Sequence, residues 1–299
     1  MTTRKDIENG LRRIGLAAGD TVVMHSSLSC FGHVRGGAAA VVDAVLEVLG
    51  PGGTLVVPTF NYAPGVFDPV ETRSLVGAIT EEVRRRPDAV RSLHPTHSVA
   101  AIGSLSRIIT EGHDRTTPFG HGSALFNVLQ ITGSKILQLG VTHTSNSIVH
   151  VAEEIAGVPY LERTRQVRVR KADGRVMEIQ VRRPGCSQGF GAIEDILQQR
   201  HAVSQTMIGE CCSRLMSARA VVDAAIELIA NDAEGLLCSR PECEVCAESR
   251  AMIAAMRVEE QDREITQMAE EDERTIRVIQ RQLGDIVEDF DPDHRPSPN

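Results

Sequence analysis

The segment 137–157, LQLGVTHTSNSIVHVAEEIAG, places the strongest constraint on how this chain can fold. It begins within a short apolar run, Ile136–Val141, which predicts a buried strand. A polar turn then leads into a helical pattern, and Ser145 or Asn146 is expected to cap that helix, because a short polar side chain can accept from its first N–H groups. A strand, a turn and a helix in this order indicate an α/β fold.

Three polar residues of this helix, Asn146, His150 and Glu153, have the spacing i, i+4, i+7 and therefore share one stripe. The other stripe carries the residues expected to face the core, Ile148, Ala152 and Ile155. On an exposed helical face, Glu153 can contact His150 and fix the tautomer of its imidazole, as a general base requires. A surface histidine paired with a helix acid is the ordinary alternative. The position just beyond a buried strand favours the general base, because open α/β sheets bind ligands there.

Length and patterning set the expected architecture. A chain of 299 residues without Trp can bury a full core built from Val, Leu, Ile and Ala. We expect an α/β fold in which helices flank a mixed sheet, with a smaller C-terminal subdomain containing a hairpin around Asp173-Gly174. Residues 1–246 would form the main domain. Residues 247–299 would form a charged tail of one long helix or two, with the last residues disordered.

The helices and strands outside the central segment are expected at positions set by the apolar pattern. Helices are predicted at 3–16, 38–49, 75–86 and 218–230, and strands at 21–25, 54–58, 99–102 and 203–207, with a further strand near 214–215.

The net charge of −8 disfavours nucleic acid and favours a cationic small molecule as partner. No run of eighteen apolar residues and no signal-peptide pattern is present, so we expect a soluble, cytoplasmic protein that does not enter a membrane. Apolar residues recur at three- and four-residue steps in the tail, at Ile253, Met256, Ile265, Met268, Ile276, Ile279 and Leu283. This stripe could pack on the domain or on a partner, and a homodimer is one way to bury it.

The seven cysteines predict free thiols or a metal site in preference to a disulfide framework. Cys238, Cys243 and Cys246 form a C-x4-C-x2-C pattern. A structural zinc ion needs four ligands, and only three are close in the sequence. Reduced cysteines without a metal are therefore expected, with zinc as the alternative.

Two further loops carry candidate binding residues. After the strand at Thr21–His25, a Ser- and Gly-bearing loop leads into the helix that starts at Ala38, so that backbone N–H groups beside Gly36 and Gly37 can meet a phosphate. Simple turn chemistry explains the two glycines equally well. Beyond the strand Thr54–Pro58, Asn61 and Asp68 are candidate contacts for an amine, although an Asp before a proline is also an ordinary turn residue.

Several stretches together resemble the aminoglycoside 3-N-acetyltransferase family, over about residues 5 to 246. They are GDTVVMHSSL (19–28), VRGG (34–37), GTLVVPT (53–59), HPTHSVAAIG (94–103), LGV (139–141), SNS (145–147), HVAE (150–153), GCS (185–187) and the helix at 217–225. The resemblance implies acetyl-coenzyme A as co-substrate and no metal. It also implies that His150 and Glu153 are the catalytic pair. The coenzyme would be bound by Ser26, Ser27, Leu28, Val34, Gly36, Gly37 and Ser98. The substrate contacts would be Asn61, Asp68 and Asn146.

The expected reaction is direct acetyl transfer to the 3-amino group of an aminoglycoside, with His150 as general base. A ping-pong route through Cys30, just past the first loop, is the rival mechanism. The acceptor could instead be another amine, including a biosynthetic intermediate, because a shared fold does not determine a substrate. A non-catalytic protein that binds coenzyme A or a partner is the competitor from a different class.

Overall fold

The computed structural model describes residues 1–113 and 117–288, and the chain divides into two units, Met1–Arg250 and Ala251–Asn299. Every strand in the part of the chain that the structure describes lies in the first unit. The boundary between the domain and the tail was expected near 246. Helix α9 (Glu244–Glu288) begins in the first unit and continues into the second.

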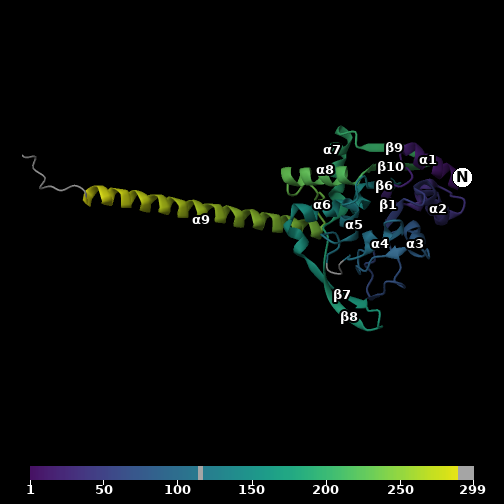
Figure 1. The fold of residues 1–299 in the computed structure, drawn as a ribbon, viewed down its shortest axis with the longest axis horizontal. Coiled ribbons are helices and arrows are strands. Elements are labelled where there is room, and N and C mark those ends of the chain that lie inside the picture. The colour runs from purple at the N-terminus through teal and green to yellow at the C-terminus, as the bar shows by residue number, and fades with distance from the viewer. Residues whose placement is uncertain (114–116, 289–299) are drawn as a thin grey trace, which may run out of the picture. The chain divides into compact units, whose positions relative to one another are not determined.

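A seven-stranded mixed sheet forms the centre of the first unit (Figure 1). Its strands are β1 (Thr21–Ser26), β2 (Thr54–Pro58), β4 (Val90–Arg91), β5 (Val99–Gly103), β6 (Lys135–Leu139), β9 (Val203–Ile208) and β10 (Cys211–Ser217). In space their order is β4-β5-β2-β1-β6-β10-β9. The three central strands β2, β1 and β6 are parallel, and each outer strand is antiparallel to its inner neighbour. The expected mixed sheet is confirmed.

One face of the sheet packs against α1 (Arg4–Ile14), α2 (Gly37–Leu49) and α3 (Ala78–Arg84). Alternate strand residues turn toward this layer because side chains along a strand point to opposite faces. They include Val22, Met24, Leu55, Val57, Leu137 and Leu139. Helix α1 begins at a capping box in which the Thr3 hydroxyl accepts from the Asp6 N–H. The expected helices at 3–16 and 38–49 are thus confirmed.

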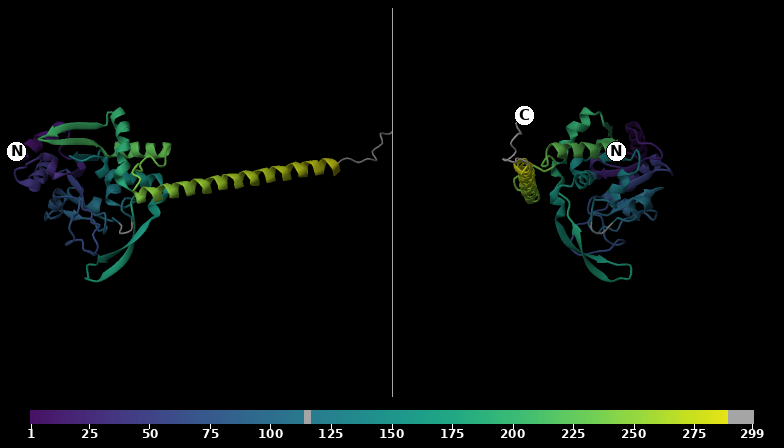
Figure 2. Two further views of the ribbon diagram at one scale, coloured as in Figure 1. Left: turned by 180° about the vertical axis from the view of Figure 1, so that it is seen from behind. Right: turned by 60° about the vertical axis from the view of Figure 1, so that its left-hand side comes forward.

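The other helices of the first unit are α4 (Ser106–Thr110), α5 (Ala124–Leu129), α6 (Val149–Ala156), α7 (Glu194–Gln199) and α8 (Ala218–Asn231). Short 3-10 turns connect the elements: η1 (Leu28–Phe31), η2 (His143–Ser145), η3 (Pro159–Glu162) and η4 (Ser187–Ile193). Helix α8 packs on α6 and contacts β6 and β10, so the sheet lies between this pair and the α1–α2 layer (Figures 1 and 2).

A second, three-stranded sheet contains β3 (Val66–Phe67) and the hairpin β7 (Thr164–Arg170)–β8 (Val176–Arg182). The hairpin turns at Asp173-Gly174, as the dipeptide predicted, with Gly174 at φ 82°. In this sheet β3 is parallel to β7.

Three local expectations were wrong. Helix α6 begins at Val149, and Asn146 contributes its backbone carbonyl, not its side chain, to that end: it accepts from the Val149 N–H. Ser145 ends a 3-10 turn instead of capping the helix. Ile155 is 47% exposed rather than in the core. The helix expected at 75–86 is shorter, because it starts at Ala78, after Gly77.

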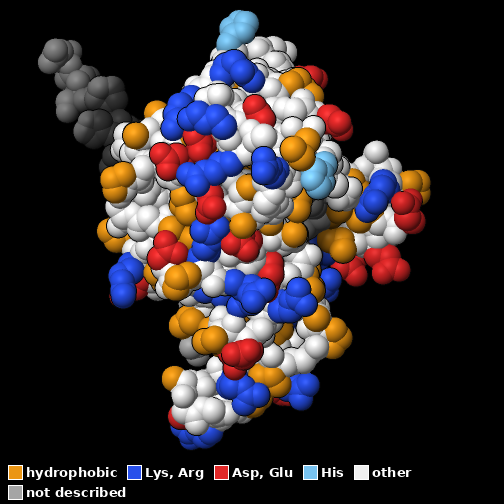
Figure 3. All heavy atoms as spheres, turned by 90° about the vertical axis from the view of Figure 1, so that its right-hand side faces the viewer, with side chains coloured by type: hydrophobic (Ala, Val, Ile, Leu, Met, Phe, Trp, Pro, Cys, Tyr) orange, Lys and Arg blue, Asp and Glu red, His pale blue; other side chains and the backbone are white. Residues whose placement is uncertain are grey.

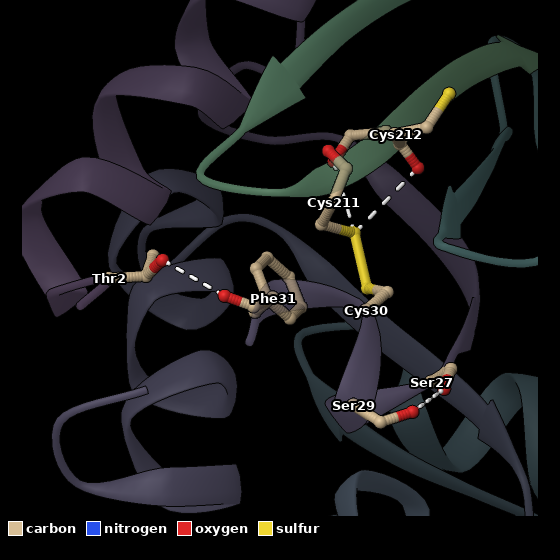
Figure 4. The surroundings of a disulfide bond; sticks show 8 residues. Thr2, Ser27, Ser29, Cys30, Phe31, Cys211 and Cys212 are labelled. Carbon is tan, nitrogen blue, oxygen red and sulfur yellow. Dashed lines mark hydrogen bonds between the residues drawn. A yellow bond between two sulfur atoms is a disulfide. The ribbon is translucent and has the colours of Figure 1, made fainter. Parts of the chain in front are cut away.

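The expectation of reduced cysteines was wrong for Cys30 and Cys211, which form a disulfide (Figure 4). Cys30 lies on η1, and Cys211 begins β10. Because 181 residues separate the two cysteines in the sequence, nothing local indicated that they would meet. The bond ties the loop after β1 to β10, which lies next to the edge strand β9.

In the second unit, Ala251–Glu288 continues α9 as one helix and not two. Ile265, Met268 and Val278 are exposed on it. The side chains of Ile276, Ile279 and Leu283, and the disorder expected for residues 291–299, lie outside the described part of the chain. Across the residues that the structure describes, no helix is both long and apolar enough to cross a membrane.

Gly140 occupies a position where the fold requires a glycine. It has φ 67°, and a Cβ there would collide with the Cys30 side chain. We expect Gly140→Ala to lower the free energy of unfolding by about 2–5 kcal/mol, from backbone strain together with overpacking. Gly174→Ala is the matched control, because Gly174 also has positive φ but open space around it. It should cost only about 1–2 kcal/mol. Equal losses in urea unfolding would contradict the proposed collision.

Candidate active site

A cavity of about 460 Å³ opens at the carboxyl ends of the three parallel strands. Ser26 ends β1, Pro58 ends β2 and Val141 follows β6, and all three line its wall. The ends of parallel strands meet at one edge of a sheet, which is where open α/β sheets bind ligands. His150, from the start of α6, also lines this cavity.

His150 heads a buried chain of hydrogen bonds. Its Nδ1 lies 2.6 Å from Glu153 Oε2, and the other carboxylate oxygen, Oε1, accepts from the Tyr160 hydroxyl at 2.8 Å. Glu153 is fully buried and His150 is 6% exposed, so the pair is not on an exposed helical face as expected. A carboxylate only accepts, so a neutral imidazole in this contact carries its proton on Nδ1 and keeps the lone pair on Nε2.

Two aromatic rings hold the imidazole of His150 in place. Phe119 stacks on it with ring centroids 4.8 Å apart, and Phe190 meets it edge-on at 4.7 Å. Both phenylalanines are buried. Together with the bond to Glu153, these contacts restrict the ring to one orientation.

A polar network fixes the loop that precedes α6. Arg214 of β10 bonds Glu194 at 2.6 Å, and a Glu194 oxygen lies 3.0 Å from His143 Nε2. The Asn146 amide nitrogen lies 3.2 Å from His143 Nδ1. Arg214 also reaches Gln138, its cross-strand partner on β6. Side chains of the sheet thereby anchor the turn that delivers His150 to the cavity.

His25 and Ser26 at the end of β1 add unsatisfied polar atoms to the cavity wall. Within the described residues, no hydrogen-bond partner reaches His25 Nε2 or Ser26 Oγ, although both atoms are buried. Burial, and then the neighbouring His143, lowers the pKa of His25 to about 3. His25 is therefore a neutral imidazole in the folded protein. Polar atoms left without protein partners are suited to contact a ligand.

The wall opposite the sheet carries three arginines from the β7–β8 hairpin and the residue after it: Arg165, Arg182 and Arg183. Arg182 pairs with Glu162 and Glu154, whereas among the described residues no carboxylate lies within 4.0 Å of Arg165 or Arg183. The described wall residues also include no Asp or Glu. Figure 3 shows basic side chains, with acidic ones among them, on the lower lobe at the height of the hairpin in Figure 1.

The residues expected to bind coenzyme A are only partly gathered at this cavity. Ser26 is in its wall. Ser27 and Leu28 follow directly, and Gly36 and Gly37 form the start of α2. The remaining two residues, Val34 and Ser98, make contacts within the fold. Val34 is buried and forms an isolated β-bridge with Thr2. The Ser98 hydroxyl bonds Thr59 and Arg91. The coenzyme assignment stays a prediction.

Asn61, Asp68 and Asn146, which were expected to contact the substrate, are not among the described residues that line the cavity. Asn61 bonds the Arg73 carbonyl and the Ala63 N–H within its own loop. Asp68 accepts from the N–H groups of Val70 and Glu71, which lower its pKa, as in the turn that was the alternative. Asn146 is fully buried against His143. Their assignment as substrate contacts stays a prediction.

Sequence reasoning missed several residues of the site. Tyr160 lies only seven residues after Glu153, but a 3-10 turn rather than helical periodicity brings it back. Phe119 and Phe190 come from distant loops and show no spacing relative to His150. The arginines could have been noticed as a basic cluster in the hairpin, within TRQVRVR and VMEIQVRR.

The fold and the site define an α/β protein with a histidine–carboxylate pair at the ligand-binding edge of its sheet. A family model described as aminoglycoside 3-N-acetyltransferase matches residues 23–230, more than two-thirds of the chain. The chain belongs to this family, and the expected resemblance is confirmed.

Curated relatives and solved structures agree with this assignment. Aminoglycoside N(3)-acetyltransferase VII of Streptomyces paromomycinus is 34% identical over 179 residues, or 52% of this chain and 62% of the relative. The chain thus spans less than two-thirds of that protein. Aminoglycoside N(3)-acetyltransferase III of Serratia marcescens is 34% identical over 59% of this chain and 73% of its own. A histidine-to-alanine mutant of aminoglycoside acetyltransferase AAC(3)-IVa, in complex with a gentamicin, is 26% identical with a TM-score of 0.76, covering 84% of this chain and 97% of that one.

The buried His25 predicts acid sensitivity of the fold. Between a pH of about 6.5 and the folded pKa, the unfolded chain binds a proton at His25 that the folded chain does not, so stability falls as pH falls. At about pH 5 the loss from His25 is about 2 kcal/mol relative to neutral pH. In urea unfolding at both pH values, His25→Gln should lose about 2 kcal/mol less than the wild type. Exposed His33→Gln is the control, and equal losses in His25→Gln and wild type would contradict the assignment.

Proposed function

We propose that this protein is an N-acetyltransferase that moves the acetyl group of acetyl-coenzyme A to the 3-amino group of an aminoglycoside. The observation that carries the proposal is the chain His150–Glu153–Tyr160, whose histidine opens on the cavity at the sheet edge. Membership of the family and the relatives' names support the acceptor class. We further propose a cytoplasmic location and a homodimer, as expected from the sequence.

The reaction needs one base, which then acts as an acid. An aliphatic ammonium must lose a proton before its nitrogen can attack a thioester carbonyl. In the proposed mechanism the ammonium first releases one proton to solvent. The neutral amine nitrogen then attacks the thioester carbonyl, and His150 Nε2 takes a second proton from this nitrogen while the new C–N bond forms. The tetrahedral intermediate then collapses, the C–S bond breaks, and the coenzyme leaves as a thiolate that receives this proton from the imidazolium. Glu153 holds Nδ1–H and stabilises the imidazolium, as the carboxylate does in other histidine-based sites.

The negative charge on the thioester oxygen requires a donor in the cavity. Ser26 is suited to this role because its buried hydroxyl lines the same cavity as His150 and has no partner among the described residues. A hydroxyl already aimed at the developing oxyanion needs little rearrangement during the reaction. We propose Ser26 as this donor.

Direct transfer is favoured over a route through Cys30. That route requires a free thiolate beside the acetyl group. Cys30 is instead bonded to Cys211, and Cys30 is not among the described residues that line the cavity. An acetyl-cysteine intermediate at Cys30 would first require reduction of this disulfide.

The arginine wall favours a second candidate acceptor. Aminoglycosides carry several ammonium groups, and unpaired Arg165 and Arg183 would repel them if they faced the acceptor. The arginines therefore bind either the phosphates of coenzyme A or an anionic group on the acceptor. In the latter case the substrate is a different amine, such as a biosynthetic intermediate with a carboxylate or phosphate.

The first test is turnover of acetyl-coenzyme A with a panel of aminoglycosides and simple amines, followed by thiol release. His150→Ala should lower kcat by about 10²–10⁴-fold, because the proton acceptor is removed. His201→Asn is the matched control: it replaces an exposed histidine at φ 51°, where Asn is tolerated. Cys30→Ala should keep its kcat. Full activity of His150→Ala, or loss of activity in Cys30→Ala together with an acetyl-Cys30 adduct in the wild type, would refute direct transfer.

The second test assigns the arginines. Arg165→Gln and Arg183→Gln should each raise one KM by about tenfold, the size of a lost charged hydrogen bond. A higher KM for acetyl-coenzyme A means that the arginines hold its phosphates, and a higher KM for the acceptor alone means an anionic acceptor. Arg175→Gln at the exposed hairpin turn is the control. If neither KM changes in Arg165→Gln and Arg183→Gln, neither arginine contacts a substrate.

A further inference from the structure

Four cysteines from three separate segments converge outside the cavity wall. Cys186 follows β8, Cys238 follows α8, Cys243 directly precedes α9 and Cys246 lies in its first turn. Their sulfur atoms all lie within 4.8 Å of one another. All four belong to the first unit of the chain. The fourth ligand that the C-x4-C-x2-C pattern lacked is therefore Cys186, which is 52 residues from Cys238 in the sequence.

We propose that these four cysteines bind a structural zinc ion. Zn²⁺ is held by four thiolates at about 2.3 Å, so sulfur atoms at the corners of a tetrahedron are about 3.8 Å apart. The sulfur atoms of Cys186 and Cys238 are 4.0 Å apart, and no two of the four sulfur atoms are more than 4.8 Å apart. These separations are close to the tetrahedral spacing. A site with four protein ligands leaves no open position for a substrate, which makes its role structural rather than catalytic.

The surroundings of the cluster are those of a metal–thiolate site. Backbone N–H groups point at two of the sulfurs: Gln188 N–H at Cys186 Sγ, 3.5 Å away, and Cys238 N–H at Cys246 Sγ, 3.4 Å away. The Arg240 side chain also interacts with the sulfurs of Cys238 and Cys243. N–H donors and a nearby cation stabilise the negative charge that four thiolates bring to one ion.

The ion would fasten a loop of the cavity to the end of the first unit. Arg183, Gly185 and Ser187, on either side of Cys186, line the cavity. A Cβ on Gly185 would come within 3.2 Å of Glu153 Oε1 and 3.0 Å of the Tyr160 ring, so this backbone directly covers the buried carboxylate. On the other side of the cluster, Arg163, three residues after Tyr160, bonds the Val245 carbonyl at 3.2 Å. Zinc binding therefore holds in place the segments that enclose Glu153 and Tyr160.

The test is the metal content of the 299-residue chain, purified under reducing conditions without chelator after growth with added zinc. Elemental analysis should give about one zinc per chain. Cys243→Ser and Cys246→Ser should lose this zinc. Cys212→Ser, at a free cysteine outside the cluster, should retain it.

Two measurements on the unmutated protein keep the test decisive if a serine variant fails to fold. Removal of the metal by a strong chelator should lower Tm by about 5 °C or more, and added zinc should restore it. Cobalt in place of zinc should give the intense visible absorption of a tetrahedral thiolate site. A wild-type protein without zinc, one that holds iron instead, one with a disulfide among these four cysteines, or loss of zinc in Cys212→Ser would each overturn the proposal.

Discussion

The site depends on a carboxylate that is completely removed from water. A buried charge is tolerated only when hydrogen bonds replace its hydration, and Glu153 receives one from each side, from His150 Nδ1 and from the Tyr160 hydroxyl. In satisfying Glu153, His150 acquires a single tautomer and a single orientation, with Nε2 as the remaining proton acceptor. The requirement of a buried acid for partners thus produces the arrangement that a general base needs.

The sheet supplies the framework for this arrangement. Its parallel centre brings the ends of β1, β2 and β6 to one edge. A row of three polar cross-strand partners, His25, Gln138 and Arg214, runs across β1, β6 and β10. Arg214 bonds Glu194, and Glu194 lies beside His143 in the turn before α6, so the polar contacts extend from the sheet to this turn. Residues far apart in the sequence therefore share one task, which is to hold the turn from which His150 enters the cavity.

Local patterns predicted what depends on local physics. The apolar run before Gly140, the apolar pattern of 3–16 and the Asp173-Gly174 turn each predicted an element to within a few residues. The i, i+3 spacing of His150 and Glu153 predicted their contact. It could not predict their burial, which comes from the Phe119 and Phe190 loops that cover α6.

Long-range pairings had no local signal. Cys30 meets Cys211 because the sheet order places β10 close to the end of β1, with only β6 between them. Cys186 meets Cys238 where η4 packs against the backbone of the segment after α8. The sequence also did not predict which charged residues line the cavity. Asp68 was expected to contact an amine, but its carboxylate accepts hydrogen bonds within its own turn. Arginines of the hairpin line the cavity instead. Charge along a sequence does not show which side chains face a ligand.

The central claim is that the neutral imidazole of His150 carries its proton on Nδ1 and presents a bare Nε2 to the cavity. The most direct test is a ¹H–¹⁵N correlation spectrum of histidine-labelled protein, with the His150 signal assigned by its absence in His150→Gln. The account predicts the Nδ1–H tautomer for His150 in the wild type. In Glu153→Gln it predicts that His150 loses its preference for this tautomer. A ring protonated on Nε2 in the neutral form would contradict it, because such a nitrogen cannot accept a proton from an amine.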